Sequence, residues 1–217
     1  MRETMKASLR ERIVYGSSCI IAGWWLKLTC GVTVRGVENV PGRGPCIIVS
    51  NHASYLDPPI IAATIRQRFI RFLARDTLLS SPLARWYFIS IRAITIDRNR
   101  GDVVAMKGVL RALKDGETVA LFPEGTRSRD GELQPPKRGI GFVLSRAQVD
   151  VVPVYVDGTF KAMPRGTSKI KRHPLQVIIG EPIPAQEIAD LGKGKEAYGK
   201  ASDLVMKRIA ALVPTHG

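Results

Sequence analysis

The sequence predicts a single α/β domain, in which a mostly parallel central sheet is flanked by helices, preceded by an apolar N-terminal helical segment. Short apolar runs rich in β-branched residues alternate with segments of helical periodicity, which is typical of βα units. Several runs are apolar throughout, as in strands covered on both faces. A chain of 217 residues is long enough to bury such a core without disulfides.

The elements follow from these patterns in chain order. We expect strands at 46–50, 70–74, 93–96, 118–122, 151–156 and 176–179. We expect helices at 58–66, 103–114, 140–147 and 196–213. Asp57 is expected to cap the first of these helices, with Pro58 at its first position. Gly116 is expected to end the helix at 103–114.

The N-terminal segment admits four interpretations. Basic residues precede an uncharged stretch at 13–26, which ends in the adjacent Trp24 and Trp25. The stretch is short for a membrane span and has no convincing signal-peptide cleavage site. A helix that packs on the core is a third alternative. We favour a helix lying in the membrane interface, with both tryptophans at headgroup level. Residues 1–30 would form this segment, and residues 31–217 the domain.

The charge balance indicates an anionic partner. Thirty-three Lys and Arg stand against 19 Asp and Glu, a net charge of +14. One basic tract comprises Arg66, Arg68, Arg71 and Arg75, and the other runs from 161 to 172. An anionic membrane, a phosphate-bearing substrate and nucleic acid compete as explanations. Because no nucleic-acid-binding signature accompanies the charge, we disfavour a nucleic-acid-binding protein.

The cysteines predict neither a disulfide framework nor a zinc site. Cys19, Cys30 and Cys46 are odd in number and form no C-x-x-C pair. We expect three buried thiols in a reducing compartment, and no metal.

A first candidate site follows the strand at 46–50. His52 and Asp57 lie in the loop after it, at the end of the strand where α/β sheets place ligands. An aspartate bonded to one imidazole nitrogen leaves the other free to act as a base. The chain has no G-x-S-x-G nucleophile motif, so the substrate could supply the hydroxyl. The alternative is a loop histidine beside a helix cap.

A second candidate site follows the strand at 118–122. Its loop reads Phe-Pro-Glu-Gly-Thr-Arg-Ser over 122–128. Glycine allows close approach of the backbone to a ligand, and Arg127 offers a bidentate fork for phosphate. The alternative is a surface turn in which Glu124 and Arg127 form a local ion pair.

Together these loops resemble the glycerolipid acyltransferase family. His52 and Asp57 match its H-x4-D motif, and 122–128 matches its Pro-Glu-Gly-Thr-Arg block. Ile96-Asp97-Arg98 and Val152-Pro153-Val154 resemble two weaker blocks that lie in the expected order.

The resemblance implies an acyl transfer from acyl-CoA or acyl-carrier protein to the sn-2 hydroxyl of 1-acylglycerol 3-phosphate, without an acyl-enzyme and without a cofactor. His52 would be the general base and Asp57 its orienting partner, while Pro153 would shape the acyl-donor region. The acceptor phosphate would be held by six residues: Arg98, Glu124, Gly125, Thr126, Arg127 and Lys137. The enzyme would lie on the cytoplasmic face of the inner membrane, as a peripheral or monotopic protein that binds an anionic surface.

Two features leave the acceptor open. Arg92 and Thr95 stand where the family often has a glycine and an aromatic residue. Glycerol 3-phosphate or a lyso-aminolipid are therefore alternative acceptors. We further expect His52→Ala and Asp57→Ala to abolish turnover and leave the fold intact, and removal of residues 1–28 to release the protein from membranes.

Overall fold

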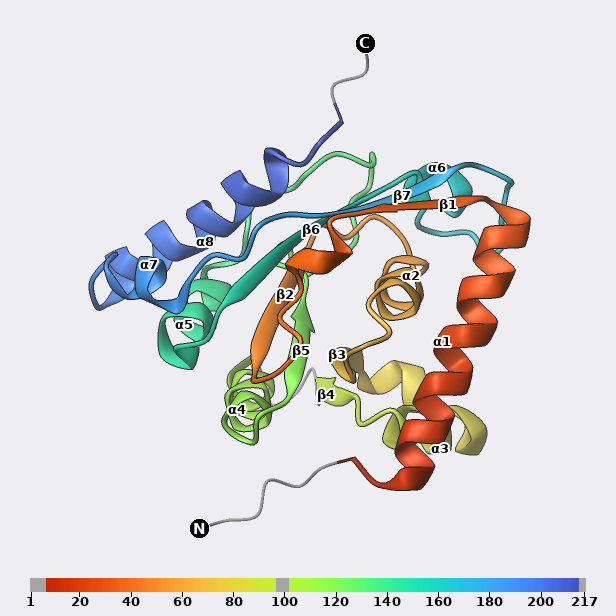
Figure 1. Cartoon of the computed structure of the whole chain (residues 1–217), viewed down its shortest axis with the longest axis horizontal. Coiled ribbons are helices and arrows are strands. Elements are labelled where there is room, and N and C mark those ends of the chain that lie inside the picture. The colour runs from red at the N-terminus through yellow and green to blue at the C-terminus, as the bar shows by residue number, and fades with distance from the viewer. Residues whose placement is uncertain (1–6, 97–101, 215–217) are drawn as a thin grey trace.

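The computed structural model describes residues 7–96 and 102–214. Its centre is a seven-stranded sheet of order β1-β7-β6-β2-β5-β3-β4, in which only β6 and β7 pair antiparallel. The strands are β1 (Val32–Arg35), β2 (Cys46–Ser50), β3 (Ile70–Arg75), β4 (Ile94–Ile96), β5 (Thr118–Leu121), β6 (Val151–Asp157) and β7 (Leu175–Ile179). The prediction of a mostly parallel sheet flanked by helices is confirmed (Figure 1).

Helices cover both faces of this sheet. They are α1 (Leu9–Thr29), α2 (Asp57–Thr64), α3 (Pro82–Ser90), α4 (Asp102–Lys114), α5 (Arg138–Ala147), α6 (Thr159–Ala162), α7 (Ala185–Ala189) and α8 (Lys195–Ala210). Short 3₁₀ turns lie at Val37–Asn39 and Asp76–Leu79. Figure 1 shows α1 and α2 on one side of the sheet and α4, α5 and α8 on the other.

The central strands are buried on both faces because their side chains enter two separate cores. Ile48 of β2 packs in the cluster beneath α1 and α2. Its neighbours Ile47 and Val49 pack in the cluster beneath α4, α5 and α8. This alternation is the strand period of two, and it explains why an unbroken apolar run predicted the strand correctly. Gly116, at φ 83°, follows α4 as expected.

One strand and three helices of the described residues were not predicted: β1, α3, and the short α6 and α7. Strand β1 has a mostly exposed burial pattern, and as an edge strand paired only with β7 it lacks the apolar run that marks the central strands. Helix α3 begins at Pro82 after the capping residue Ser81, and none of the apolar residues that follow it is buried. Strand β1 and helix α3 lie outside the two-sided core, where the pattern is weakest.

Helix α1 has one buried face and one exposed apolar face. Tyr15, Cys19 and Leu26 pack into the core, and Gly23 allows a close approach to Ala63 of α2. The opposite face carries large apolar side chains in solvent: Leu9, Ile13, Ile20, Ile21, Trp24, Trp25 and Leu28. Among the described helices, none combines the length and hydropathy that a membrane crossing requires. Deleting residues 1–28 would therefore open the core as well as remove the exposed face.

The tract Arg66–Arg75 does not form one basic surface. The buried Arg68 guanidinium donates to Thr118 and to the carbonyls of Pro41 and Gly44. Arg71 forms an ion pair with Glu117 at 2.6 Å. Two of the four arginines thus hold loops and strands together, because each buried guanidinium needs partners. All three cysteines are buried and free, as expected.

Candidate active site

The candidate residues gather at one edge of the sheet. Since β2, β3, β4, β5 and β6 are mutually parallel, the loops that follow them share this edge. The loop after β2 carries His52, and the loop after β5 carries the segment 122–128. They are joined directly, because the Ser128 backbone N–H donates to the His52 carbonyl at 2.7 Å.

His52 and Asp57 form a hydrogen-bonded pair. The imidazole Nδ1 lies 2.8 Å from Asp57 Oδ2, and the His52 side chain is 16% exposed. Because a carboxylate fixes the proton on Nδ1, Nε2 is left as the basic nitrogen. His52 also lines a cavity. This arrangement can support general-base chemistry, in which Asp57 orients the imidazole.

Asp57 organises the whole loop. Its fully buried carboxylate accepts the Ala53 and Ser54 backbone N–H groups through Oδ2, at 2.7 and 2.8 Å. The Thr159 hydroxyl donates to Oδ1 at 2.6 Å. Two expectations are corrected. The helix cap is Leu56, because the carboxylate turns back onto the loop and not onto α2. Asp57→Ala would leave three buried donors without their acceptor, so we expect it to lower the stability of the fold as well as turnover.

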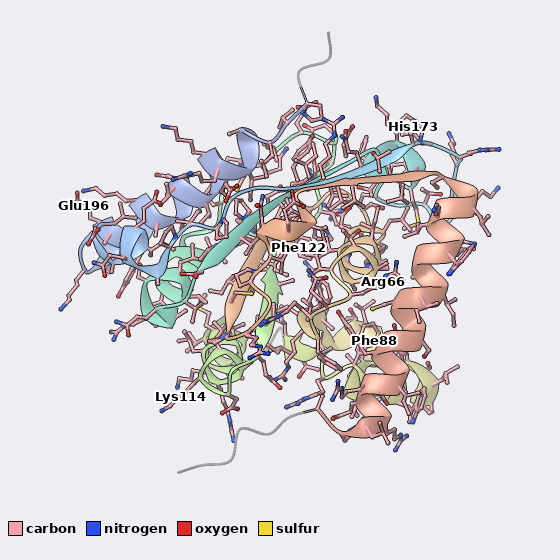
Figure 2. The ribbon with its side chains drawn as sticks, in the orientation of Figure 1. Arg66, Phe88, Lys114, Phe122, His173 and Glu196 are labelled. Carbon is pink, nitrogen blue, oxygen red and sulfur yellow. The ribbon has the colours of Figure 1, made fainter. Side chains whose placement is uncertain are left out.

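The His52 ring and backbone are held from the second loop. Phe122 stacks on the imidazole, with ring centroids 4.0 Å apart and planes 18° from parallel. Phe122 lies near the centre of the molecule (Figure 2). The His52 N–H donates to Glu124 Oε1 at 3.2 Å. Both contacts restrict the ring to the orientation in which Nδ1 meets Asp57.

Glu124 is a buried carboxyl with one oxygen unpartnered. The residue is 3% exposed, and Oε2 has no hydrogen-bond partner among the described residues. Burial raises the pKa of Glu124 to about 7, and the nearby Asp57 charge adds to the rise. The sequence alternative, an ion pair with Arg127, is wrong, since Arg127 stacks on Tyr55 instead.

The raised pKa of Glu124 predicts a pH dependence of stability. Between the ordinary value of 4.5 and about 7, the folded state holds more protons than the unfolded state. The free energy of unfolding should therefore fall as pH rises through this window, and Glu124→Gln should remove that contribution. Urea unfolding of both proteins at pH 5 and pH 8 checks this. Glu132→Gln, at an exposed position, is the control. If the free energy of unfolding changed between pH 5 and pH 8 by the same amount in Glu124→Gln as in the unaltered protein, the prediction would be contradicted.

Four of the six expected phosphate-binding residues line the same cavity as His52, namely Gly125, Thr126, Arg127 and Lys137, and the described cavity lining does not include Glu124. The Arg127 guanidinium lies 3.5 Å above the Tyr55 ring, a cation–π contact that holds it at the cavity. Lys137 folds against Gly125, where a Cβ would lie 2.6 Å from Lys137 Cδ. Gly125 also has φ 65°, so both space and backbone favour glycine here. Thr126 lines the same cavity.

The cavity is lined by both polar and apolar side chains. Its volume is about 310 Å³. The polar lining includes His52, Arg127 and Lys137, and the apolar lining includes Leu73, Val109 and Val143. Such a space suits a ligand with an anionic head and a hydrocarbon chain.

Three remaining positions have different outcomes. Arg98 lies outside the described residues. Pro153 is buried within β6 opposite Val49 and is not among the residues that line the cavity, so its acyl-donor role stays a prediction without support from the cavity. Arg92 forms an ion pair with Glu117 at 2.8 Å and does not line the cavity among the described residues.

Sequence reasoning missed three residues of this site. Tyr55 lies between His52 and Asp57. An aromatic residue in a loop that was expected to bind a ligand could have been included among the candidate site residues. Phe122 was assigned to the strand end and not to the imidazole. Thr159 lies 102 positions from Asp57, and no local pattern links them.

Comparisons with known proteins agree with the geometry. The family model described as Acyltransferase matches residues 31–157. A Bacillus subtilis protein named 1-acyl-sn-glycerol-3-phosphate acyltransferase is 28% identical over 187 residues, 86% of this chain and 90% of that protein. A chloroplastic Brassica napus protein of the same activity name, BAT2, is 35% identical over 154 residues, 69% of this chain and 44% of the plant protein.

A solved structure has the same fold. The crystal structure of the 1-acyl-sn-glycerophosphate (LPA) acyltransferase PlsC from Thermotoga maritima matches with a TM-score of 0.77 and 25% identity, covering 95% of this chain and 81% of that one. The chain spans less than half the length of the plant relatives, 44% and 43% of the Brassica napus and Arabidopsis thaliana proteins.

Proposed function

Since this chain belongs to the Acyltransferase family, we propose that it transfers a fatty acyl group from an acyl thioester to the free sn-2 hydroxyl of 1-acylglycerol 3-phosphate, giving phosphatidic acid. The observation that carries the proposal is the His52–Asp57 pair, whose Nδ1 and Oδ2 lie 2.8 Å apart, with His52 lining a cavity that has both cationic and apolar side chains in its wall. The names of the bacterial relatives support the choice of acceptor.

The proposed reaction is a direct transfer. His52 Nε2 removes the proton from the acceptor hydroxyl as its oxygen attacks the thioester carbonyl carbon. The tetrahedral intermediate then collapses, the C–S bond breaks, and the departing thiolate takes the proton from the imidazolium. The buried Asp57 carboxylate stabilises the imidazolium between the two steps. Holding base, hydroxyl and thioester together supplies much of the rate enhancement.

Arg127 is proposed to hold the acceptor phosphate. Arginine forms bidentate, charge-assisted hydrogen bonds with phosphate, and Tyr55 fixes the guanidinium beside His52. Arg127→Gln should raise the KM for lysophosphatidic acid about tenfold or more, with a smaller change in kcat. Kinetics with monoacylglycerol, which has no phosphate, are the control. An equal loss for both acceptors would contradict this role.

Membrane association is proposed to occur through α1 and α3. Leu83 and Ile89 of α3 are largely exposed, and α3 lies beside the N-terminal half of α1 (Figure 1). Arg10 of α1 lies 5.5 Å from the Trp86 ring of α3. An exposed apolar surface built from two adjacent helices, with tryptophans and cations, is typical of interfacial binding.

Point changes on α1 test this surface without opening the core. Ile21 and Leu28 are 67% and 72% exposed. Ile21→Glu with Leu28→Glu should weaken binding to anionic vesicles at least tenfold, since each buried apolar side chain contributes about 1.5–3 kcal/mol. Val103→Glu, on the exposed face of α4, is the matched control. Equal vesicle binding by all three proteins would refute the surface.

The acceptor is tested by a panel assay. Detergent-solubilised protein is supplied with long-chain acyl-CoA and, in separate reactions, lysophosphatidic acid, glycerol 3-phosphate or a lyso-aminolipid. We expect the largest kcat/KM with lysophosphatidic acid. A larger value with either other acceptor would replace the proposed acceptor, and no acyl transfer to any of them would overturn the proposed function.

A further inference from the structure

A basic segment reaches the cavity through one of its residues, Arg165. We call residues 161–172 the basic strap; it carries Lys161, Arg165, Lys169, Lys171 and Arg172. All five side chains are exposed, and none forms an ion pair with another described residue. No acidic residue lies between Gly158 and Gly180. The strap therefore presents uncompensated positive charge to solvent.

The strap is fixed to the active-site loop at its start. Thr159, two residues before it, donates to Asp57 at 2.6 Å. The Ser54 hydroxyl, next to the catalytic pair, donates to the Met163 carbonyl at 2.7 Å. The Lys171 N–H returns to the Ala162 carbonyl at 2.8 Å, so the strap is a closed loop. Its position relative to His52 is thus defined by hydrogen bonds.

Arg165 connects the strap to the cavity. Its guanidinium Nη1 lies 3.4 Å from the Arg127 carbonyl oxygen, and its side chain lines the cavity together with Arg127. The described cavity wall contains four cations, Arg75, Arg127, Lys137 and Arg165, and no acidic residue. One phosphate monoester carries a charge of about −1.5 to −2. The positive charge of the cavity wall is therefore larger than the negative charge of the acceptor phosphate. Arg165, which belongs to the strap, supplies part of this additional charge.

We propose that Arg165 and the basic strap bind the phosphate of a phosphopantetheine thioester, the acyl donor. Acyl-CoA and acyl-carrier protein both carry the acyl group on the thiol of a phosphopantetheine arm, so the recognised chemistry is shared. With its phosphate at the strap, the flexible arm leads the thioester along the cavity wall to His52. This inference rests on the proposed function, and it assigns the donor phosphate to the strap and the acceptor phosphate to Arg127.

An anionic membrane is the competing use of the strap. The strap's outer end approaches the C-terminal end of α1, because the Leu175 N–H donates to the Gly31 carbonyl at 2.9 Å. Figure 2 shows His173 at the upper right edge of the molecule, away from Phe122 at its centre. The position of Arg165 favours donor binding over membrane binding, since Arg165 lines the cavity and contacts Arg127.

Calorimetry without any acceptor tests the proposal. Coenzyme A, 4′-phosphopantetheine and pantetheine are titrated into the full-length protein and into Arg165→Gln/Lys169→Gln. We expect the double variant to bind coenzyme A and 4′-phosphopantetheine about tenfold or more weakly, and pantetheine unchanged. Arg165→Lys/Lys169→Arg should keep most of the affinity. Lys193→Gln/Lys195→Gln, which removes two exposed charges that are not part of the described cavity wall, should change nothing.

The other outcomes overturn the proposal. Equal affinity of the unaltered protein for all three ligands would mean that no phosphate is recognised. A double variant that keeps its affinity for coenzyme A but loses binding to anionic vesicles would assign the strap to the membrane. The calorimetry contains no acceptor, so it would still measure donor binding if the protein failed to acylate lysophosphatidic acid. A failure of phosphate recognition would likewise leave the acceptor assay unaffected.

Discussion

His52→Gln is expected to lower kcat for acyl transfer by about 10²–10⁴-fold, the usual contribution of a positioned general base. Glutamine fills most of the space and keeps the backbone, so the bonds from Ser128 to the His52 carbonyl and from the His52 N–H to Glu124 remain. The urea midpoint should therefore stay close to that of the unaltered protein. Steady-state turnover with lysophosphatidic acid and acyl-CoA is the measurement.

The matched control for this change is His173→Gln. His173 follows the basic strap in the sequence and does not line the described cavity. It should retain full turnover. If His52→Gln kept more than a tenth of the unaltered kcat, His52 would not be the base, and the role of the pair would have to be reassigned.

Comparing Asp57→Ala with Asp57→Asn should separate the contribution of Asp57 to stability from its contribution to catalysis. Asp57→Ala removes the acceptor for two backbone N–H groups and the Thr159 hydroxyl, all in a buried loop. It should cost about 2–4 kcal/mol in the free energy of unfolding. Asp57→Asn keeps one oxygen for the loop N–H groups and should cost far less.

Both substitutions should nevertheless lower kcat by at least about 10²-fold. The asparagine amide carries no charge to stabilise the imidazolium that forms when His52 takes the proton. Urea unfolding and turnover measured on both variants give the two effects separately. Near-normal turnover in Asp57→Asn would show that the charge is not needed, and equal stability of the two variants would contradict the loop role.

The sequence predicted those parts of the fold that have a local signal. The strands β2, β5 and β6 are short apolar runs because they are buried on both faces, and the two ligand loops follow β2 and β5 directly. Edge strand β1 and the exposed α3 have no such signal. Their positions depend on pairing and packing with distant segments, which no window of sequence contains.

The roles of charged residues were harder to predict than the elements. Arg68 and Arg71 belong to an apparent surface tract, yet their guanidinium groups bind Thr118 and Glu117 across the sheet. One alternative from the sequence paired Glu124 with its neighbour Arg127, but the folded loop directs Glu124 to the His52 N–H. A charged side chain can reach many partners, and only tertiary structure selects among them.

The H-x4-D spacing, in contrast, predicted a contact that the structure contains. A turn-rich loop of this length brings His52 and Asp57 within hydrogen-bond distance, as expected. The spacing did not reveal what holds the pair. Phe122 and Thr159 come from other strand ends and reach the pair only because β5 and β6 flank β2.

The most direct test of the central claim is the stoichiometry of a single reaction. Purified protein is incubated with lysophosphatidic acid and acyl-CoA, and phosphatidic acid, free coenzyme A and the intact mass of the protein are measured together. Direct transfer predicts equal amounts of phosphatidic acid and coenzyme A, with no acylated protein at any time. Release of coenzyme A without phosphatidic acid, or an acyl adduct on the protein, would contradict it.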